Sequence, residues 1–99
     1  MKRKLLAPQR HAVFQLAPDL LLVFKPRGHR EEAHRHPYRQ RLRVLRGLLM
    51  VRTARQAILL RAGGPPLTLA AGRTHATVAW RDTWLVAVKP TRAGAPRGA

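Results

Sequence analysis

Cysteine is absent from the 99 residues of this chain. Its absence excludes a disulfide scaffold, a thiolate nucleophile and cysteine-based metal sites such as a zinc ribbon, and it is compatible with a reducing cytoplasm. Acidic residues are almost as scarce, because Asp and Glu together contribute only 4 side chains. Little besides the histidines therefore suggests chemistry.

Long hydrophobic runs are also missing. No apolar stretch approaches the about 18 residues that a membrane-spanning helix requires, and the run from Leu20 to Phe24 is far too short. The first eight residues have the basic opening of a signal peptide, but no apolar segment follows them. We therefore expect a soluble, cytoplasmic protein without a membrane partner.

Basic residues dominate the composition and give a formal net charge of +16. A basic surface binds nucleic acid by releasing counterions from phosphate. However, the charges are spread along the chain, and a preference for Arg over Lys is typical of GC-rich coding and of some thermophiles. We expect non-specific association with nucleic acid and keep a specific nucleic-acid function as an alternative.

The chain is long enough for one domain. Residues 1–10 are basic and aperiodic and predict a flexible arm, whereas residues 91–99 hold no large apolar residue and predict a disordered tail. The domain then covers residues 11–90. A core this small gains from burial at an interface, so we expect a homodimer.

Short apolar runs, separated by Pro and Gly, fill the predicted domain. Runs of this length and spacing are typical of a β-sandwich or a small barrel. The runs that predict strands are 11–16, 20–25, 40–45, 48–52, 57–61, 66–69, 75–80 and 83–88.

A helix is the alternative over residues 38–61, where Leu and Arg are good helix formers. Within this segment, charged Arg41 and Arg43 alternate with apolar Leu42 and Val44. A period of two places the arginines on one face of a strand and the apolar residues on the other, so a strand is favoured. By the same parity His34, His36 and Gln40 belong to the inner face.

Those three polar residues form a spaced set, and His75 follows in a distant run. Neutral imidazole is a strong ligand for Zn, Fe, Ni and Mn. Two imidazoles two residues apart on one strand can reach the same ion, and Gln40 can add an amide oxygen. One divalent metal ion of unknown identity is the expected cofactor.

At these residues the sequence resembles the cupin superfamily, in particular its small single-domain members. The first cupin motif is Gly, five residues, His-x-His, three or four residues, Glu, six residues, Gly. The second is Gly, five residues, Pro-x-Gly, two residues, His, three residues, Asn. The matching residues are Gly28, His34, His36 and Gly47, then Gly64, Gly72 and His75, while Gln40, Ala70 and Ala79 replace Glu, Pro and Asn.

The resemblance implies an all-β fold, a jelly-roll barrel of two antiparallel sheets in a single domain, with the metal inside its wider end. It implies His34, His36, Gln40 and His75 as metal ligands. The four motif glycines would be structural turns. A homodimer is the commonest assembly of such proteins.

The amide at Gln40 leaves the reaction open, because it removes both a negatively charged ligand and a general base. Tyr38 and Arg73 are candidates for binding a small-molecule substrate. His11, His29, Glu31 and Glu32 are read as loop or surface residues. Three functions remain: a metal-binding cupin with a small-molecule pocket, a non-catalytic cupin scaffold that senses a ligand or serves a structural role, and a basic nucleic-acid-binding protein.

Overall fold

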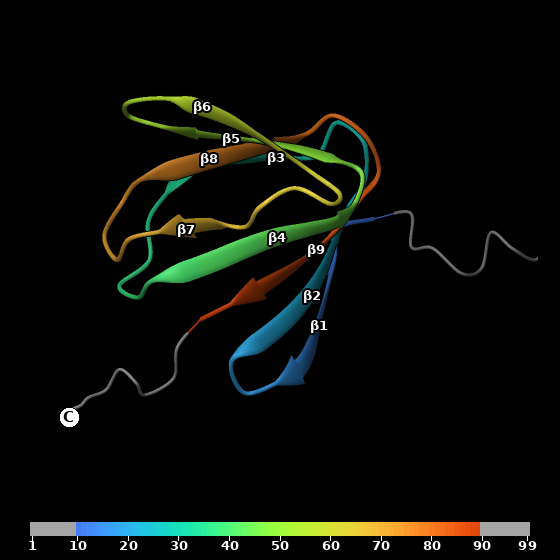
Figure 1. Ribbon diagram of the computed structural model, residues 1–99, viewed down its shortest axis with the longest axis horizontal. Helices are drawn as coiled ribbons and strands as arrows, with labels where there is room; N and C mark the ends of the chain where they lie inside the picture. Colours follow the sequence, from blue (N-terminus) through green and yellow to red (C-terminus); the bar gives the residue numbers. More distant parts are fainter. Residues whose placement is uncertain (1–9, 90–99) are drawn as a thin grey trace, which may run out of the picture.

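The computed structural model describes residues 10–89, and within them every regular element is a strand (Figure 1). The predicted arm and tail lie outside this range, apart from Arg10. No helix capable of crossing a membrane occurs among the described residues. The strands are β1 (Ala12–Ala17), β2 (Leu20–Lys25), β3 (Arg30–His34), β4 (Gln40–Arg46), β5 (Leu48–Thr53), β6 (Ala57–Arg61), β7 (Leu67–Leu69), β8 (His75–Ala79) and β9 (Thr83–Val88).

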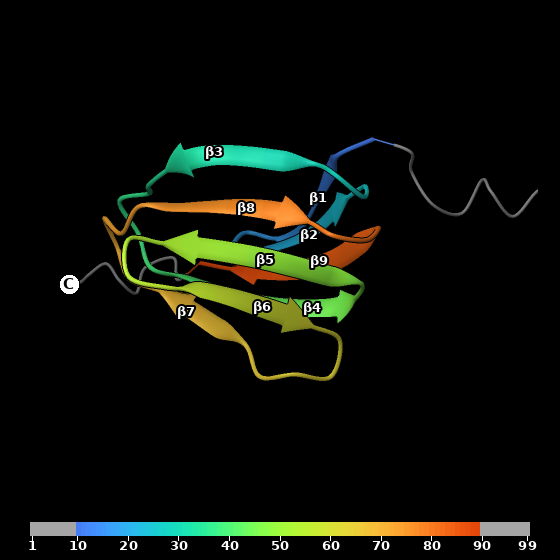
Figure 2. The same ribbon diagram turned by 90° about the horizontal axis from the view of Figure 1, so that it is seen from above.

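The strands form two sheets that face each other. One sheet has the order β1-β2-β9-β4-β7 and the other β3-β8-β5-β6, and all the pairings are antiparallel. Figure 2 shows the sheet of β3, β8, β5 and β6 lying in front of the sheet that contains β4 and β9. The predicted all-β, two-sheet jelly roll is confirmed.

Each of the eight predicted strands is present, and the helical alternative for residues 38–61 is wrong because β4, β5 and β6 occupy that segment. The ninth strand, β3, is not among the predicted ones. Its sequence, Arg-Glu-Glu-Ala-His, has no apolar period, and the interpretation of Glu31 and Glu32 as loop residues is wrong. Backbone pairing with β8 makes this segment a strand, so neighbouring strands rather than its own side chains determine its conformation.

The core lies between the sheets and follows the predicted parity. In β4, Leu42 and Val44 are buried while Arg41 and Arg43 are exposed. The other sheet contributes Leu49 and Val51 from β5, both fully buried. Alternation of arginine and aliphatic residues therefore places charge in solvent and a continuous apolar layer inside.

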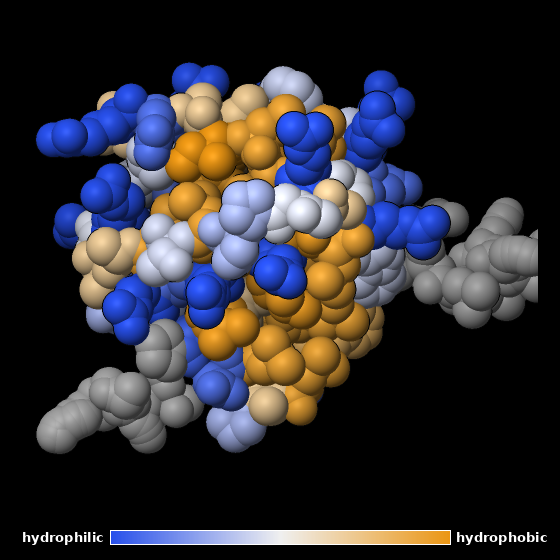
Figure 3. All heavy atoms as spheres, viewed as in Figure 1, coloured by the Kyte–Doolittle hydropathy of each residue, from blue (hydrophilic) through white to orange (hydrophobic). Residues whose placement is uncertain are grey.

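The edge strand β1 leaves large apolar side chains in solvent. Val13, Phe14 and Leu16 are 51%, 43% and 56% exposed. Figure 3 shows an apolar surface at the lower right of the molecule, in the region where Figure 1 places β1, β2 and β9, with hydrophilic residues above it and to its left. A continuous apolar area on a surface marks a contact site more often than isolated apolar residues do.

The turn between β4 and β5 requires glycine. Gly47 has a φ of 103°, and a Cβ built there would lie 2.6 Å from Thr83 Oγ1 and against the carbonyl oxygen of Asp82. The Thr83 hydroxyl accepts a hydrogen bond from the Leu48 amide at 3.1 Å and lies 2.7 Å from the Arg81 carbonyl oxygen. Backbone strain and close packing coincide at this position.

We expect Gly47→Ala to destabilise the protein more than Gly63→Ala, the matched control. Gly63 also has a positive φ, of 81°, but a Cβ there meets nothing within 4 Å. The control should lose about 1–2 kcal/mol from backbone strain, and Gly47→Ala about 1–3 kcal/mol more from overpacking. Urea unfolding measures both losses. Equal losses would show that the contact with the Asp82–Thr83 turn has no energetic consequence.

Candidate metal centre

Three histidines from separate parts of the sequence meet at one end of the barrel. His34 ends β3 and His75 begins β8, and the two residues are directly opposite each other in the antiparallel pairing. His36 follows in the connection to β4. One ligand nitrogen from each of the three lies within 4.8 Å of the other two. This cluster is called the His triad below.

Backbone hydrogen bonds orient two of the imidazoles. His34 Nδ1 is 2.8 Å from the Glu32 carbonyl oxygen, and His75 Nδ1 is 3.2 Å from the Arg73 carbonyl oxygen. Because a carbonyl only accepts, each Nδ1 carries the hydrogen. Nε2 is then the nitrogen with a lone pair for a metal, and a carbonyl partner on the other ring nitrogen is usual for metal-binding histidines.

The third imidazole is held by an aromatic neighbour. The Tyr38 hydroxyl is 3.2 Å from His36 Nδ1, and the two rings stack with their centroids 4.9 Å apart. Lys89 Nζ lies over the Tyr38 ring, 5.0 Å from its centroid. Tyr38 therefore positions His36 while presenting its own hydroxyl beside the triad.

The environment favours neutral imidazoles. Burial lowers the pKa of His36, and the neighbouring His34 and His75 lower it further. Burial is also the main cause of the lowered pKa of His75. The hydrogen bond to the Arg73 carbonyl acts in the opposite direction and raises this pKa, but by less. A metal binds the neutral form, so these two side chains fit a metal without first losing a proton at neutral pH.

The His triad opens into a cavity of about 280 Å³ between the two sheets. Aliphatic side chains line part of its wall, mostly from the five-stranded sheet, including Val23, Leu42 and Leu85. Tyr38 and Gln40 also line the cavity. A volume of this size suits a small molecule and excludes a polymer.

The sequence matches no known family model, and no curated protein is similar to it. Solved structures are similar in fold. A cupin-2 domain protein from Shewanella frigidimarina is 20% identical, with a TM-score of 0.66 over 87% of this chain and 86% of that chain. A cupin superfamily protein from Desulfitobacterium hafniense is 13% identical, with a TM-score of 0.69 over 81% and 74%. KdgF from Halomonas sp. is 22% identical, with a TM-score of 0.65 over 81% and 76%.

This chain has a cupin fold. Sequence identities this low carry the architecture and nothing about substrate or reaction. Within the cupin barrel, His34 and His36 of the first motif lie beside His75 of the second. The first motif runs from the turn before β3 to the turn after β4, and the second ends on β8.

The motif glycines differ in conformation. Gly28 and Gly72 have φ values of 87° and 79°, which favour glycine over other residues. Gly64 has an ordinary φ. Its amide donates to the Arg61 carbonyl oxygen at 3.0 Å in the turn after β6, and the positive φ of that turn belongs to Gly63.

The two candidate substrate residues lie in different places. Tyr38 lines the cupin cavity, whereas the Arg73 side chain lines a separate hollow beside β6 and β7. Only the Arg73 carbonyl, through its bond to His75, contacts the triad. The Arg73 guanidinium is therefore not among the groups that a molecule in the triad cavity meets.

Charged residues that sequence reasoning passed over also line the cavity. Lys25 is only 5% exposed, and its Nζ lies 3.0 Å from Glu31 Oε1. Burial is the largest single influence and raises the pKa of Glu31, but Lys25, His11 and His29 together outweigh it, and the net pKa is lowered. Parity could have found Lys25, which shares a face of β2 with Leu21 and Val23.

Parity could not have found Glu31. The register of β3 against β8 shifts between Glu31 and His34. Because of this shift, odd-numbered Glu31 and even-numbered His34 both face the cavity. His11 and His29, read as surface residues, lie next to Glu31, with their rings stacked 4.4 Å apart. Only the three-dimensional arrangement brings them together.

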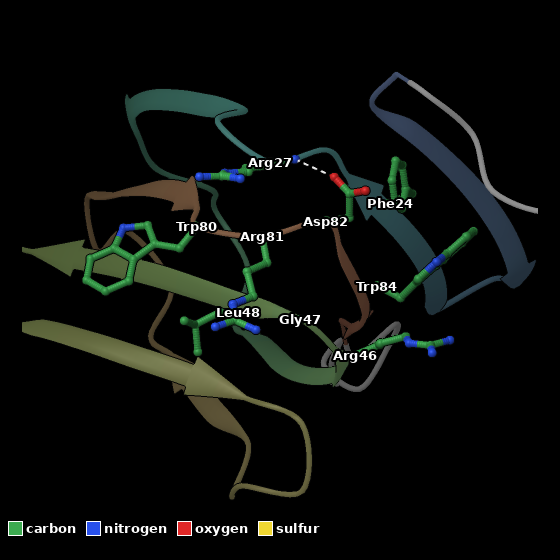
Figure 4. Close-up of a pocket in the computed structure, with 9 residues that line it drawn as sticks. All are labelled: Phe24, Arg27, Arg46, Gly47, Leu48, Trp80, Arg81, Asp82 and Trp84. Carbon is green, nitrogen blue, oxygen red and sulfur yellow. Dashed lines mark hydrogen bonds between the residues drawn. The ribbon is translucent and has the colours of Figure 1, made fainter. Parts of the chain in front are cut away.

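A second hollow lies at the opposite end of the strands. It is an open groove of about 890 Å³, and Figure 4 shows Arg27 and Trp80 on one side of it and Arg46 and Trp84 on the other. The Asp82 carboxylate accepts a hydrogen bond from the Arg27 backbone amide at 2.8 Å. Among residues 10–89, every ion pair involves Glu31 and none involves an arginine.

Proposed function

We propose that this protein is a small cupin that holds one divalent metal ion, Fe, Zn, Mn or Ni, at His34, His36 and His75 and takes a small molecule into the adjoining cavity. The observation that supports the proposal most directly is the convergence of three ligand nitrogens within 4.8 Å. Carbonyl hydrogen bonds to Nδ1 of His34 and His75 leave Nε2 for the metal.

Gln40 is proposed as a neutral fourth ligand through its amide oxygen. It begins β4 and lines the cavity beside the triad. Because it replaces the carboxylate of the cupin motif, the site binds its ion without the charge compensation that a Glu would add. The affinity of the site should therefore be lower than that of a His₃Glu site.

A bound ion supplies Lewis acidity to an oxygen atom of the small molecule. The chain contributes orientation: the Tyr38 hydroxyl stands beside the triad, and the aliphatic wall favours an apolar portion of the ligand. An amide at position 40 takes up no proton near neutral pH. This observation keeps ligand sensing on a non-catalytic cupin scaffold as the alternative to an enzyme.

A second candidate function is nucleic-acid binding, favoured by the groove of Figure 4. Arg27, Arg46 and Arg81 line it without ion-pair partners among the described residues. Trp80 is 47% exposed there and offers a surface for stacking a base. The binding we propose is non-specific and driven by charge.

The proposed assembly is a homodimer formed through β1. Among residues 10–89 this strand pairs only with β2, so its other edge is unpaired within that range, and its apolar side chains Val13, Phe14 and Leu16 are exposed. An unpaired edge with apolar side chains is a template for pairing with another chain. A second copy covers both the open backbone and the apolar surface.

Replacing both His34 and His36 with Ala should remove one equivalent of bound divalent metal from the untagged protein. The two residues are surface-accessible at the barrel end, so we expect the fold to persist. Elemental analysis of the purified protein measures the metal, and circular dichroism measures the fold. Metal content equal to that of the wild-type protein would sink the proposal.

Two further variants sharpen this test. Arg35→Ala, between the two histidines and exposed, is the matched control and should keep its metal. Gln40→Glu should bind the metal at least about tenfold more tightly, because a carboxylate adds charge to the site. Unchanged affinity in Gln40→Glu would remove residue 40 from the ligand set.

Changing Arg27 and Arg81 to Gln should weaken binding to a labelled single-stranded oligonucleotide more than changing Arg41 and Arg43, on the exposed face of β4. Both pairs remove two charges, so only position differs. Affinity in all variants should fall steeply with salt. Fluorescence anisotropy measures it, and equal weakening by both pairs would contradict a groove-based interaction.

Leu16→Glu should convert the dimer to a monomer, since it places a charge in the proposed β1 interface. Leu59→Glu, on β6 at a residue 42% exposed, is the control and should remain dimeric. Sedimentation velocity at micromolar concentration distinguishes the states. A monomeric wild-type protein would refute the proposed assembly.

A further inference from the structure

A second group of potential ligands shares no residue with the His triad. His11 precedes β1, His29 lies in the turn between β2 and β3, and Glu31 is on β3. One ligand atom from each lies within 4.8 Å of the other two. Two imidazoles and a carboxylate form a donor set typical of transition-metal sites.

The distances among these atoms are too long for hydrogen bonds and close to those of ligands around one ion. His29 Nε2 is 3.6 Å and His11 Nε2 is 3.8 Å from Glu31 Oε2. Ligands of a tetrahedral zinc site are about 3.4 Å apart, given metal–ligand bonds of about 2.0–2.1 Å. A closure of a few tenths of an ångström would bring each histidine nitrogen to that distance from Glu31 Oε2.

His29 Nε2 also lacks a partner. This atom is buried and, among the residues that the structure describes, no group hydrogen-bonds to it. A buried polar atom without a partner carries a cost in free energy. A cation bound between His29 and Glu31 would remove that cost. The 3.6 Å contact between His29 Nε2 and Glu31 Oε2 does not remove it, because that distance is too long for a hydrogen bond.

Lys25 holds the other oxygen of the same carboxylate. Its Nζ is 3.0 Å from Glu31 Oε1 and 3.5 Å from Thr77 Oγ1. The ammonium therefore occupies Oε1 and leaves Oε2 facing the two histidines. A hydrogen bond to the non-ligating oxygen is how proteins commonly orient a ligating carboxylate.

We propose that His11, His29 and Glu31 form a second binding site for a divalent transition-metal ion of the zinc class. Two neutral nitrogens and a single carboxylate select against Ca²⁺ and Mg²⁺, which require a shell of oxygen ligands. Glu31 and His11 line the same cavity as the His triad. A small molecule held there lies between the two sites.

The site is independent of the His triad and is tested in its absence. In a His34→Ala, His36→Ala background of the untagged, metal-stripped full chain, Zn²⁺ titration by calorimetry should give one equivalent. Adding Glu31→Gln should weaken that binding at least tenfold. Adding Glu32→Gln, which neutralises the adjacent exposed carboxylate on β3, should leave it unchanged.

His29→Ala separates ligation from folding, because it leaves the Lys25–Glu31 pair intact. We expect the same loss of Zn²⁺ affinity in His29→Ala as in Glu31→Gln, with circular dichroism like that of the background protein. No Zn²⁺ uptake by the background, or equal affinity in the Glu31 and Glu32 variants, would overturn the second site. The difference in metal content between the wild-type protein and the His34→Ala, His36→Ala protein tests the triad separately, so either site can fail alone.

Discussion

The pairing of β3 with β8 is the interaction on which both clusters of potential ligands depend. It places His34 opposite His75, and its register shift also turns Glu31 into the cavity. β3 has no buried side chain of its own, so backbone hydrogen bonds hold it on the sheet. A polar strand at the edge of a sheet can thus place potential metal-binding side chains in the interior. An apolar strand in the same place would contribute only apolar contacts.

Sequence periodicity predicted most of the fold because apolar runs alternate with turn residues. It predicted β4 well, since arginine and aliphatic residues alternate there residue by residue. The same reasoning missed β3, whose strand conformation comes from β8. The triad was indicated by the spacing of histidines and glycines together, through its resemblance to the two cupin motifs. No local pattern indicated that His11 and His29 lie beside Glu31, because pairing between distant segments and a shifted register create that cluster.

Charge is distributed very unevenly between surface and interior. The chain carries +16 overall, yet Glu31 takes part in every ion pair of the described residues. Arginines on the outer faces are solvated, and the interior holds one buried ammonium, one carboxylate and a set of imidazoles. A metal ion at either proposed site would meet cationic surroundings that water screens at the surface and that the Glu31 carboxylate partly offsets inside.

The Thr83 side chain joins the two sheets at one end of the barrel. Its fully buried hydroxyl lies within hydrogen-bonding distance of both the amide nitrogen and the carbonyl oxygen of Leu48, and so it ties β9 of one sheet to β5 of the other. Gly47 packs against the same turn. The two sheets are thus joined by side-chain hydrogen bonds at this end of the barrel, opposite the end where the histidines meet.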